Sequence, residues 1–462
     1  MRVQPSRHPL ILALCLALIP PALAVPGAAR AAEITEVADA ADGEDPFDLE
    51  LELGWNRVLK QSKITRENLQ GGGILDVTEL RHKQVISEMQ IRARAGLYKD
   101  LEINFMLPIV FADTQTWRSA DLDGLPQQST IFQQDGICPN GTIDTVNCTG
   151  AMFDFDPFVG SDNNSYRGGL GDFHVGLAWG ILNDERDRYD PSWTIGFDWQ
   201  APTADKRSQS NVSHDSANPA AIGEKTNYFT FYTALSKNLG LVDPFVDFHY
   251  RLPSPQVPHA WHNCENPSNL ADFDPDDDQV GTTCTNDPIG HEWVREGNNR
   301  GGYMPSHVGG MTFGAEFLPY VDPERYVRVA FQLSFTADYV SEGRVFNELS
   351  DALQKSLYGD EFLRLSGTLG VRVQASRYAK FHVLATYGHE TEHFLTGESI
   401  GKDLDDTGLV ELPGIDTDPT SDVSPNPEQN PNYDFRYDQP GRRFRVEETT
   451  LFGIMLTGEV NF

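Results

Sequence analysis

Long apolar runs are scarce in this chain of 462 residues. After the first 31 residues no stretch approaches the roughly 18 apolar residues that a membrane-spanning helix needs. Basic residues are also in short supply, because 36 Lys and Arg stand against 68 Asp and Glu and the net charge is −32. Such a chain repels phosphate backbones, so nucleic acid is excluded as a partner.

Cysteine is rare as well, with five residues in the whole chain. Apart from Cys15, they form two close pairs, Cys138 with Cys148 and Cys264 with Cys284. More than one pairing is possible, but two local disulfides are the simplest in an oxidising compartment. No C-x-x-C spacing occurs, so the cysteines do not indicate a zinc site.

The N-terminus has the pattern of a secretory signal peptide. Arg2, Arg7 and His8 precede the short apolar run LILALCLALIPPALA, and Ala29-Arg30-Ala31 offers small residues for cleavage. We therefore predict a signal peptide over residues 1–31, which takes no part in the fold of an exported chain.

Alternation of apolar and polar residues is abundant. In VISEMQIRARAGL every second residue except Ser87 is apolar, and in LEINFMLPIVF every second residue is apolar; the pattern recurs along the chain to the last residues, LTGEVNF. Period-two alternation predicts strands with one apolar face, and the segments amount to about twelve strands. Alternation by itself also fits a soluble β-sandwich.

The connections decide between these two folds. Short links, such as 98–100 and 319–324, alternate with long ones at about 58–80, 113–170, 202–225, 253–306, 341–360 and 394–442. Tyrosines gather at the short links. An even strand number, alternating loop lengths and an aromatic girdle are typical of an outer-membrane barrel. The prediction is an all-β transmembrane antiparallel β-barrel over residues 32–462, with short periplasmic turns, long extracellular loops and a closing strand at about 443–462.

The stretch GGLGDFHVGLAWGILNDERDRYDPSWTIGFDWQAPTADK resembles outer-membrane transporters of the family associated with the meta-pathway of phenol degradation. The resemblance is carried by Gly169, Gly171 and Asp172 at a strand start and by Pro202-Thr203 after the next strand. It extends over roughly residues 85–395. It implies a passive channel for small, aromatic or apolar molecules.

Charged residues in the middle of strands are the candidate lumen-lining, selectivity residues. They fall on the polar face, together with Glu88 and Glu102, and they are Arg92, Arg94, Asp247, His249, Arg251, Arg328, Arg364, Arg372 and His382. Such residues either fill a narrow barrel as paired charges or form a ladder that selects solutes. Because arginines predominate in these strand centres, a comparatively basic lumen is expected.

The stretch DFDPDDD is a weak metal-site candidate. Its alternating carboxylates, Asp272, Asp274, Asp276 and Asp278, are hard oxygen ligands suited to Ca²⁺, but the glycine and distal glutamate of an EF-hand loop are missing. The alternative is a solvated acidic loop. No other cofactor is expected.

An enzyme is not predicted, although GHETEHF contains H-E-x-x-H over residues 389–393. That zinc motif needs a helix, whereas these residues continue the strand KFHVLATYG, in which positions four apart are about 13 Å from each other. A metal site at the rim or plain polar residues are the alternatives. A barrel hydrolase would need an activated nucleophile, and Ser213-His214-Asp215 has no strand context.

The predicted function is therefore an outer-membrane, porin-like channel for passive or selective diffusion of small molecules. Its expected partners are outer-membrane lipid and lipopolysaccharide, the barrel-assembly machinery and the solute itself, in a Gram-negative bacterial envelope. The alternative is a structural or surface-interaction barrel with a plugged lumen that acts through its long acidic loops.

Overall fold

The structure is a computed structural model of the whole chain. It describes residues 32–38, 40, 48–70, 73–119, 164–184, 189–207, 212–255, 304–322, 324–353, 355–399, 432–433 and 437–462. The signal-peptide segment, the four paired cysteines and the DFDPDDD carboxylates lie outside the described residues, so those predictions stay predictions.

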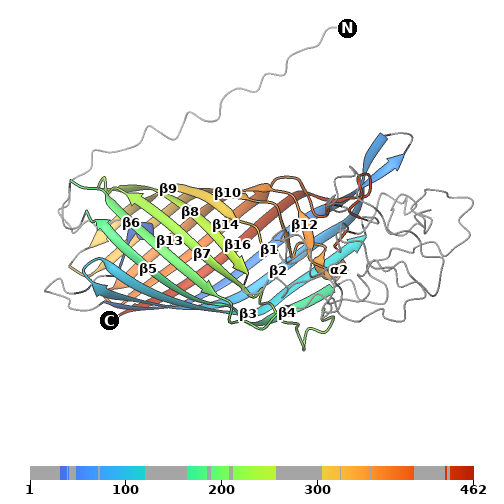
Figure 1. Cartoon of the computed structure of the whole chain (residues 1–462). Coiled ribbons are helices and arrows are strands. Elements are labelled where there is room, and N and C mark those ends of the chain that lie inside the picture. Colours follow the sequence, from blue (N-terminus) through green and yellow to red (C-terminus); the bar gives the residue numbers. More distant parts are fainter. Residues whose placement is uncertain are drawn as a thin grey trace, which may run out of the picture.

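Twelve antiparallel strands close into a barrel (Figure 1). In ring order they are β1 (Leu49–Gln70), β2 (Gly73–Tyr98), β3 (Leu101–Ser119), β5 (Phe173–Leu182), β6 (Ser192–Ala201), β7 (Thr226–Ser236), β8 (Val242–Pro255), β9 (Val308–Asp322), β10 (Val327–Val340), β13 (Phe362–Ser376), β14 (Ala379–Glu390) and β16 (Phe444–Asn461). The ring closes where β16 pairs with β1, from Glu50 opposite Asn461 to Arg66 opposite Phe444. The predicted barrel and its strand number are confirmed.

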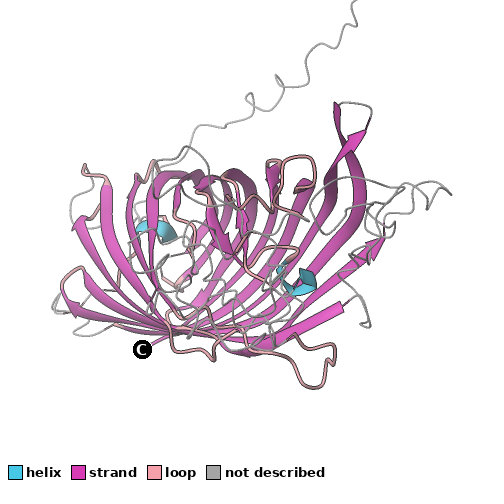
Figure 2. Cartoon of the chain, turned by 45° about the vertical axis from the view of Figure 1, so that its right-hand side comes forward, coloured by secondary structure: helices cyan, strands magenta, loops and turns pink. Residues whose placement is uncertain are grey.

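The remaining elements lie at the two ends of the barrel. β4 (Asn164–Leu170) pairs with the outer half of β3, and β15 (His393–Phe394) pairs with β16. β11 (Gly343–Val345) and β12 (Leu357–Gly359) form a separate hairpin that holds helix α2 (Ser350–Leu353). The 3-10 helix η1 (Glu33–Thr35) and α2 are seen within the barrel outline in Figure 2.

The outward face of the strands is apolar, as expected for a wall against lipid. Its exposed side chains include Phe331, Leu333 and Phe335 along β10 and Phe452, Ile454 and Leu456 along β16. Tyrosines lie exposed at the short-turn end: Tyr98, Tyr189, Tyr320, Tyr326 and Tyr378. The described residues contain no helix long and apolar enough to cross a membrane. The exposed apolar side chains form a band around the closed sheet, and the exposed tyrosines form an aromatic girdle at its short-turn end.

One predicted long connection is wrong. Residues 58–80 belong to β1 and β2, which remain paired as far as Gln70 opposite Gly73 and rise beyond the rest of the wall (Figure 1). The alternation weakens there because the inward face changes from polar to apolar. Ile64 and Leu80 are fully buried in a cluster with Trp117, Leu349 and Phe444. The compact hydrophobic core thus lies inside the end of the barrel that carries the long connections.

Candidate channel lumen

The predicted lumen residues all lie on the inward face, and most of them are held by carboxylates. Arg94 contacts Glu50 at 2.6 Å and Glu102 at 2.8 Å, and Arg92 contacts Glu52 at 3.3 Å. These partners come from the strands on either side of β2. The inner wall near the short turns is therefore tied together by charge-assisted contacts, which are the stronger kind of hydrogen bond.

One histidine of the inner wall contacts two carboxylates, one on its own strand and one on the next strand but one. His249 on β8 lies 2.9 Å from Asp247 and 3.0 Å from Asp338 on β10, and β9 runs between them. Gly310 on β9 makes this crossing possible, because a Cβ at that position would meet the Asp338 carboxylate and lie 2.7 Å from His249 Nε2. Arg251, two residues further along β8, stacks over Tyr228 at 3.7 Å.

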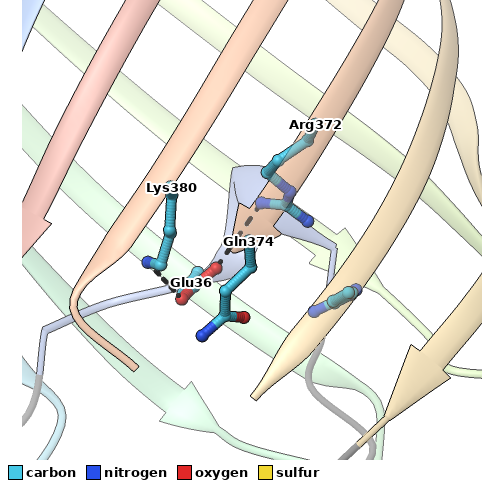
Figure 3. A pocket seen from close by; sticks show the side chains of 5 residues that line it. Glu36, Arg372, Gln374 and Lys380 are labelled. Atoms are coloured by element: carbon cyan, nitrogen blue, oxygen red, sulfur yellow. Dashed lines mark hydrogen bonds and ion pairs between the residues drawn. The ribbon is translucent and has the colours of Figure 1, made fainter. Parts of the chain in front are cut away.

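The short-turn end of the lumen is crossed by the N-terminal strap, defined here as residues 32–38 with Ala40. Its carboxylates contact basic side chains of β13 and β14: Glu33 lies 3.2 Å from Arg372 and 3.4 Å from His382, and Glu36 lies 3.2 Å from Lys380. Figure 3 shows Glu36 between Lys380 and Arg372, in a pocket that Arg328 and Gln374 also line.

Further contacts fasten the strap to the opposite side of the barrel. The Thr35 hydroxyl lies 2.6 Å from that of Ser236 on β7, and the Ala38 N–H donates to Glu102 on β3 at 2.8 Å. Ala40 pairs with Lys99 beside the first short turn. The strap thus spans the lumen and is held there mainly by polar groups.

The outer plug, defined here as residues 343–353 and 355–359, lies at the long-connection end and contains α2. Asp351 of α2 is almost fully buried and binds Arg167 and Arg207, each at 2.8 Å. Burial by itself raises the pKa of the Asp351 carboxyl, but the two guanidinium groups outweigh burial and hold the pKa below its ordinary value. Trp117 of β3 donates to the Glu348 carbonyl at 2.7 Å.

Between strap and plug, the inner wall carries an apolar stripe on β1, β2, β14 and β16. It consists of half-buried side chains on the inward face: Val58, Ile86, Leu384, Leu451 and Met455. Their proximity follows from the register, since Met455 pairs with Leu384 and Val58 pairs with Ile86. Polar alternation was used to identify the lumen, so these apolar inward residues were missed; reading both faces of each strand would have found them.

The expectation of a basic lumen is wrong. Inward carboxylates outnumber inward arginines in the described wall and include Glu50, Glu52, Glu88, Glu102, Asp198, Asp243, Asp247, Glu316, Asp338, Glu390 and Glu459. Most of the inward carboxylates that the sequence analysis did not single out lie near strand ends. The sequence does not indicate that these carboxylates contact arginines of neighbouring strands. The lumen charges are therefore largely paired.

The H-E-x-x-H residues do not converge. His389 is exposed on β14, Glu390 is buried and binds Lys60 at 2.7 Å, and His393 stacks on Phe362. The predicted strand is confirmed only as far as Glu390, where β14 ends; Thr391 and Glu392 lie between β14 and β15. Within the described residues, no group of three or more His, Cys, Asp or Glu side chains could hold a metal ion.

Comparison with known proteins gives likenesses of fold only. No protein-family model and no curated protein matches the sequence. Among solved structures, an outer membrane channel from Pseudomonas putida F1 aligns with a TM-score of 0.37 at 10% identity, covering 89% of this chain and 95% of that one.

Two further solved structures are similar over most of their length. A Pseudomonas aeruginosa FadL homologue has a TM-score of 0.31 at 7% identity, with 90% of each chain covered. The outer membrane protease OmpT from Escherichia coli has a TM-score of 0.27 at 8% identity, covering 90% of this chain and 97% of that one. A channel and a protease are both among these neighbours, so the likeness does not decide between transport and hydrolysis. What the chain's own geometry establishes is a closed twelve-strand barrel with an apolar outer wall and a charged inner wall.

Proposed function

We propose that the barrel is a channel in the bacterial outer membrane through which small molecules with an aromatic or other apolar part diffuse passively. This agrees with the resemblance to transporters of the phenol meta-pathway family. The proposal includes export by a cleaved signal peptide and insertion by the barrel-assembly machinery.

The observation that carries this proposal is the apolar stripe on the inner wall. A barrel of this size that serves only as a scaffold fills its interior with paired polar groups or packed core. Here Leu384, Met455 and their neighbours are half-buried on the inner wall between the strap and the outer plug. They offer an apolar solute a surface that water wets poorly, within an otherwise polar lumen.

The test measures flux into liposomes that contain the purified barrel. Benzoate, which has an aromatic ring, is compared with acetate, which lacks one. We expect the double variant Leu384→Ser/Met455→Ser to lower the benzoate-to-acetate flux ratio roughly three- to tenfold, because apolar contact is lost. Thr386→Ser, on the same inner face, is the matched control and should leave the ratio unchanged.

The interaction barrel remains the second candidate, and the strap and outer plug specifically favour it, since both lie across the lumen. It predicts no flux of either solute even when residues 33–40 are deleted. It also predicts a loss of function when the connection at 256–303, outside the described residues, is shortened. Solute flux that persists in the shortened protein would instead support the channel.

A further inference from the structure

Basic side chains gather on the outside of the barrel just beyond the apolar band. On β1, β2 and β3, the last apolar row contains Leu59 and Val85, which pair directly. One step further towards the long-connection end, Lys83 lies between Gln61 and Thr116. The outward face thus changes from apolar to cationic within one row, about 7 Å along the strands.

The next row is formed by three cations. Arg81 pairs with Lys63 on one side and with Arg118 on the other. Arg81, Lys83 and Arg118 are exposed, and they alternate with inward, buried neighbours such as His82 and Trp117. Like charges placed directly opposite each other destabilise a sheet unless an anion lies between them.

Carboxylates near Arg81, Lys83 and Arg118, which are called the outer patch here, contact Lys63 and Arg445 instead. Glu447 lies 2.8 Å from Lys63, and Asp76 lies 3.1 Å from Arg445. The side chains of Arg81, Lys83 and Arg118 make no ion pair or hydrogen bond with any other residue that the structure describes. Inward arginines of the same barrel behave differently, since Arg94 and Arg372 each contact two or more carboxylates.

A further cation lies below the outer patch, within the apolar band. Arg57 is exposed on the outward face and pairs with Ile454 and Ser87. A guanidinium among lipid tails is costly unless its long side chain extends towards the polar boundary. An Arg57 side chain extended along the strand would reach from the Ser87 row towards the row that contains Lys83.

We propose that Arg81, Lys83 and Arg118, assisted by Arg57, bind the phosphate groups of a phosphorylated glycolipid in the outer leaflet, namely lipopolysaccharide. The ligand's acyl chains lie on the apolar band below the patch, and its phosphates lie against the cations above. Arginine forks suit phosphate because they donate two parallel hydrogen bonds. The patch also fixes how deep the barrel sits in the membrane.

The test uses the full-length barrel folded in detergent and measures its binding to diphosphoryl lipid A. The triple variant Arg81→Ser/Lys83→Ser/Arg118→Ser should bind at least about tenfold more weakly than the unaltered protein, since each cation near an anionic lipid contributes on the order of 1 kcal/mol. The matched control is Lys237→Ser/Arg325→Ser/Arg377→Ser, which loses the same charge at the short turns and should bind normally. Heat-dependent mobility on gels verifies folding of both.

A second arm separates phosphate recognition from acyl-chain contact. Dephosphorylated lipid A should bind the unaltered barrel about as weakly as diphosphoryl lipid A binds the triple variant. Equal binding of the two lipids, or normal binding by the triple variant, would overturn the proposal. If the triple variant fails to fold, the test uses the single variant Arg118→Gln and the salt dependence of binding by the unaltered barrel. The variant should bind more weakly, and binding by the unaltered barrel should fall with rising salt, since phosphate contacts are screened by ions. Normal binding by the variant and no effect of salt would overturn the proposal.

Discussion

At the scale of single residues, the wall depends on positions where one side chain leaves room for another. Gly310 is such a position, because His249 and Asp338 meet above its Cα on the inner face. The glycine is needed here for space, since its backbone shows no positive φ.

We expect Gly310→Ala to lower the free energy of unfolding by about 1–3 kcal/mol, because the added methyl group collides with the His249–Asp338 contact. Gly309→Ala is the matched control, since its Cβ would meet only Tyr250, at 3.3 Å. Urea titration of both variants in lipid vesicles measures the difference. Equal stability of the two would show that the histidine contact contributes nothing.

Also at the residue scale, Asp351 should make the stability of the outer plug depend on pH. Its folded pKa lies below the ordinary value, so the stabilisation is complete above about pH 4 and is lost as the pH falls further. Asp351→Asn leaves Arg167 and Arg207 without their buried carboxylate and should cost about 3–5 kcal/mol at neutral pH.

The measurement is the difference in melting temperature between Asp351→Asn and the unaltered protein, followed from pH 7 to pH 3. We expect this difference to shrink below pH 4, because acid protonates the carboxylate that the variant already lacks. A difference that stays constant over this range would contradict the ion-pair account of the plug.

At the scale of elements, the N-terminal strap is the part of the lumen best suited to move. It is a single short segment, its buried apolar side chains are alanines, and its strongest contacts are ion pairs from Glu33 and Glu36 to the wall. Ion pairs in a partly wetted lumen are weak compared with apolar packing. The outer plug differs, since Leu349 and Leu357 belong to the compact core.

We expect Glu33→Gln/Glu36→Gln to raise the mean conductance of the barrel in planar bilayers, because the strap loses its contacts with Arg372, Lys380 and His382. Glu324→Gln, exposed in the turn before β10, is the control. Unaltered conductance in the double variant, together with unaltered conductance after deletion of residues 33–40, would mean that the strap does not limit permeation.

At the scale of the whole molecule, the two faces of the wall must tolerate charge differently. Leu369 is outward and well exposed, whereas its neighbour Thr368 faces the lumen and bonds Thr386 at 2.9 Å. Leu369→Arg places a charge in lipid and should cost about 2–4 kcal/mol of folding free energy in vesicles. Thr368→Arg should cost less than half of this, because its charge can reach water in the lumen. The reverse order would contradict the assignment of the faces.

The sequence by itself determined the barrel. Alternation assigned the two faces of β2, β3, β10 and β16, and the even strand number indicated a barrel. These are local properties, because a strand's two faces follow from its own residue order. The loop lengths then set which end carries the short turns, with the exception of β1 and β2, whose inward apolar residues hid their extension.

Only the tertiary structure decided what fills the barrel. The contacts of Glu33 with Arg372 and of Arg167 with Asp351 join residues that lie far apart in the sequence, and no periodicity relates them. For the same reason, the sequence suggested a basic lumen, while the structure pairs its arginines with carboxylates from neighbouring strands. The cations of the outer patch likewise come from separate strands, and only their register places Arg81 between Lys63 and Arg118.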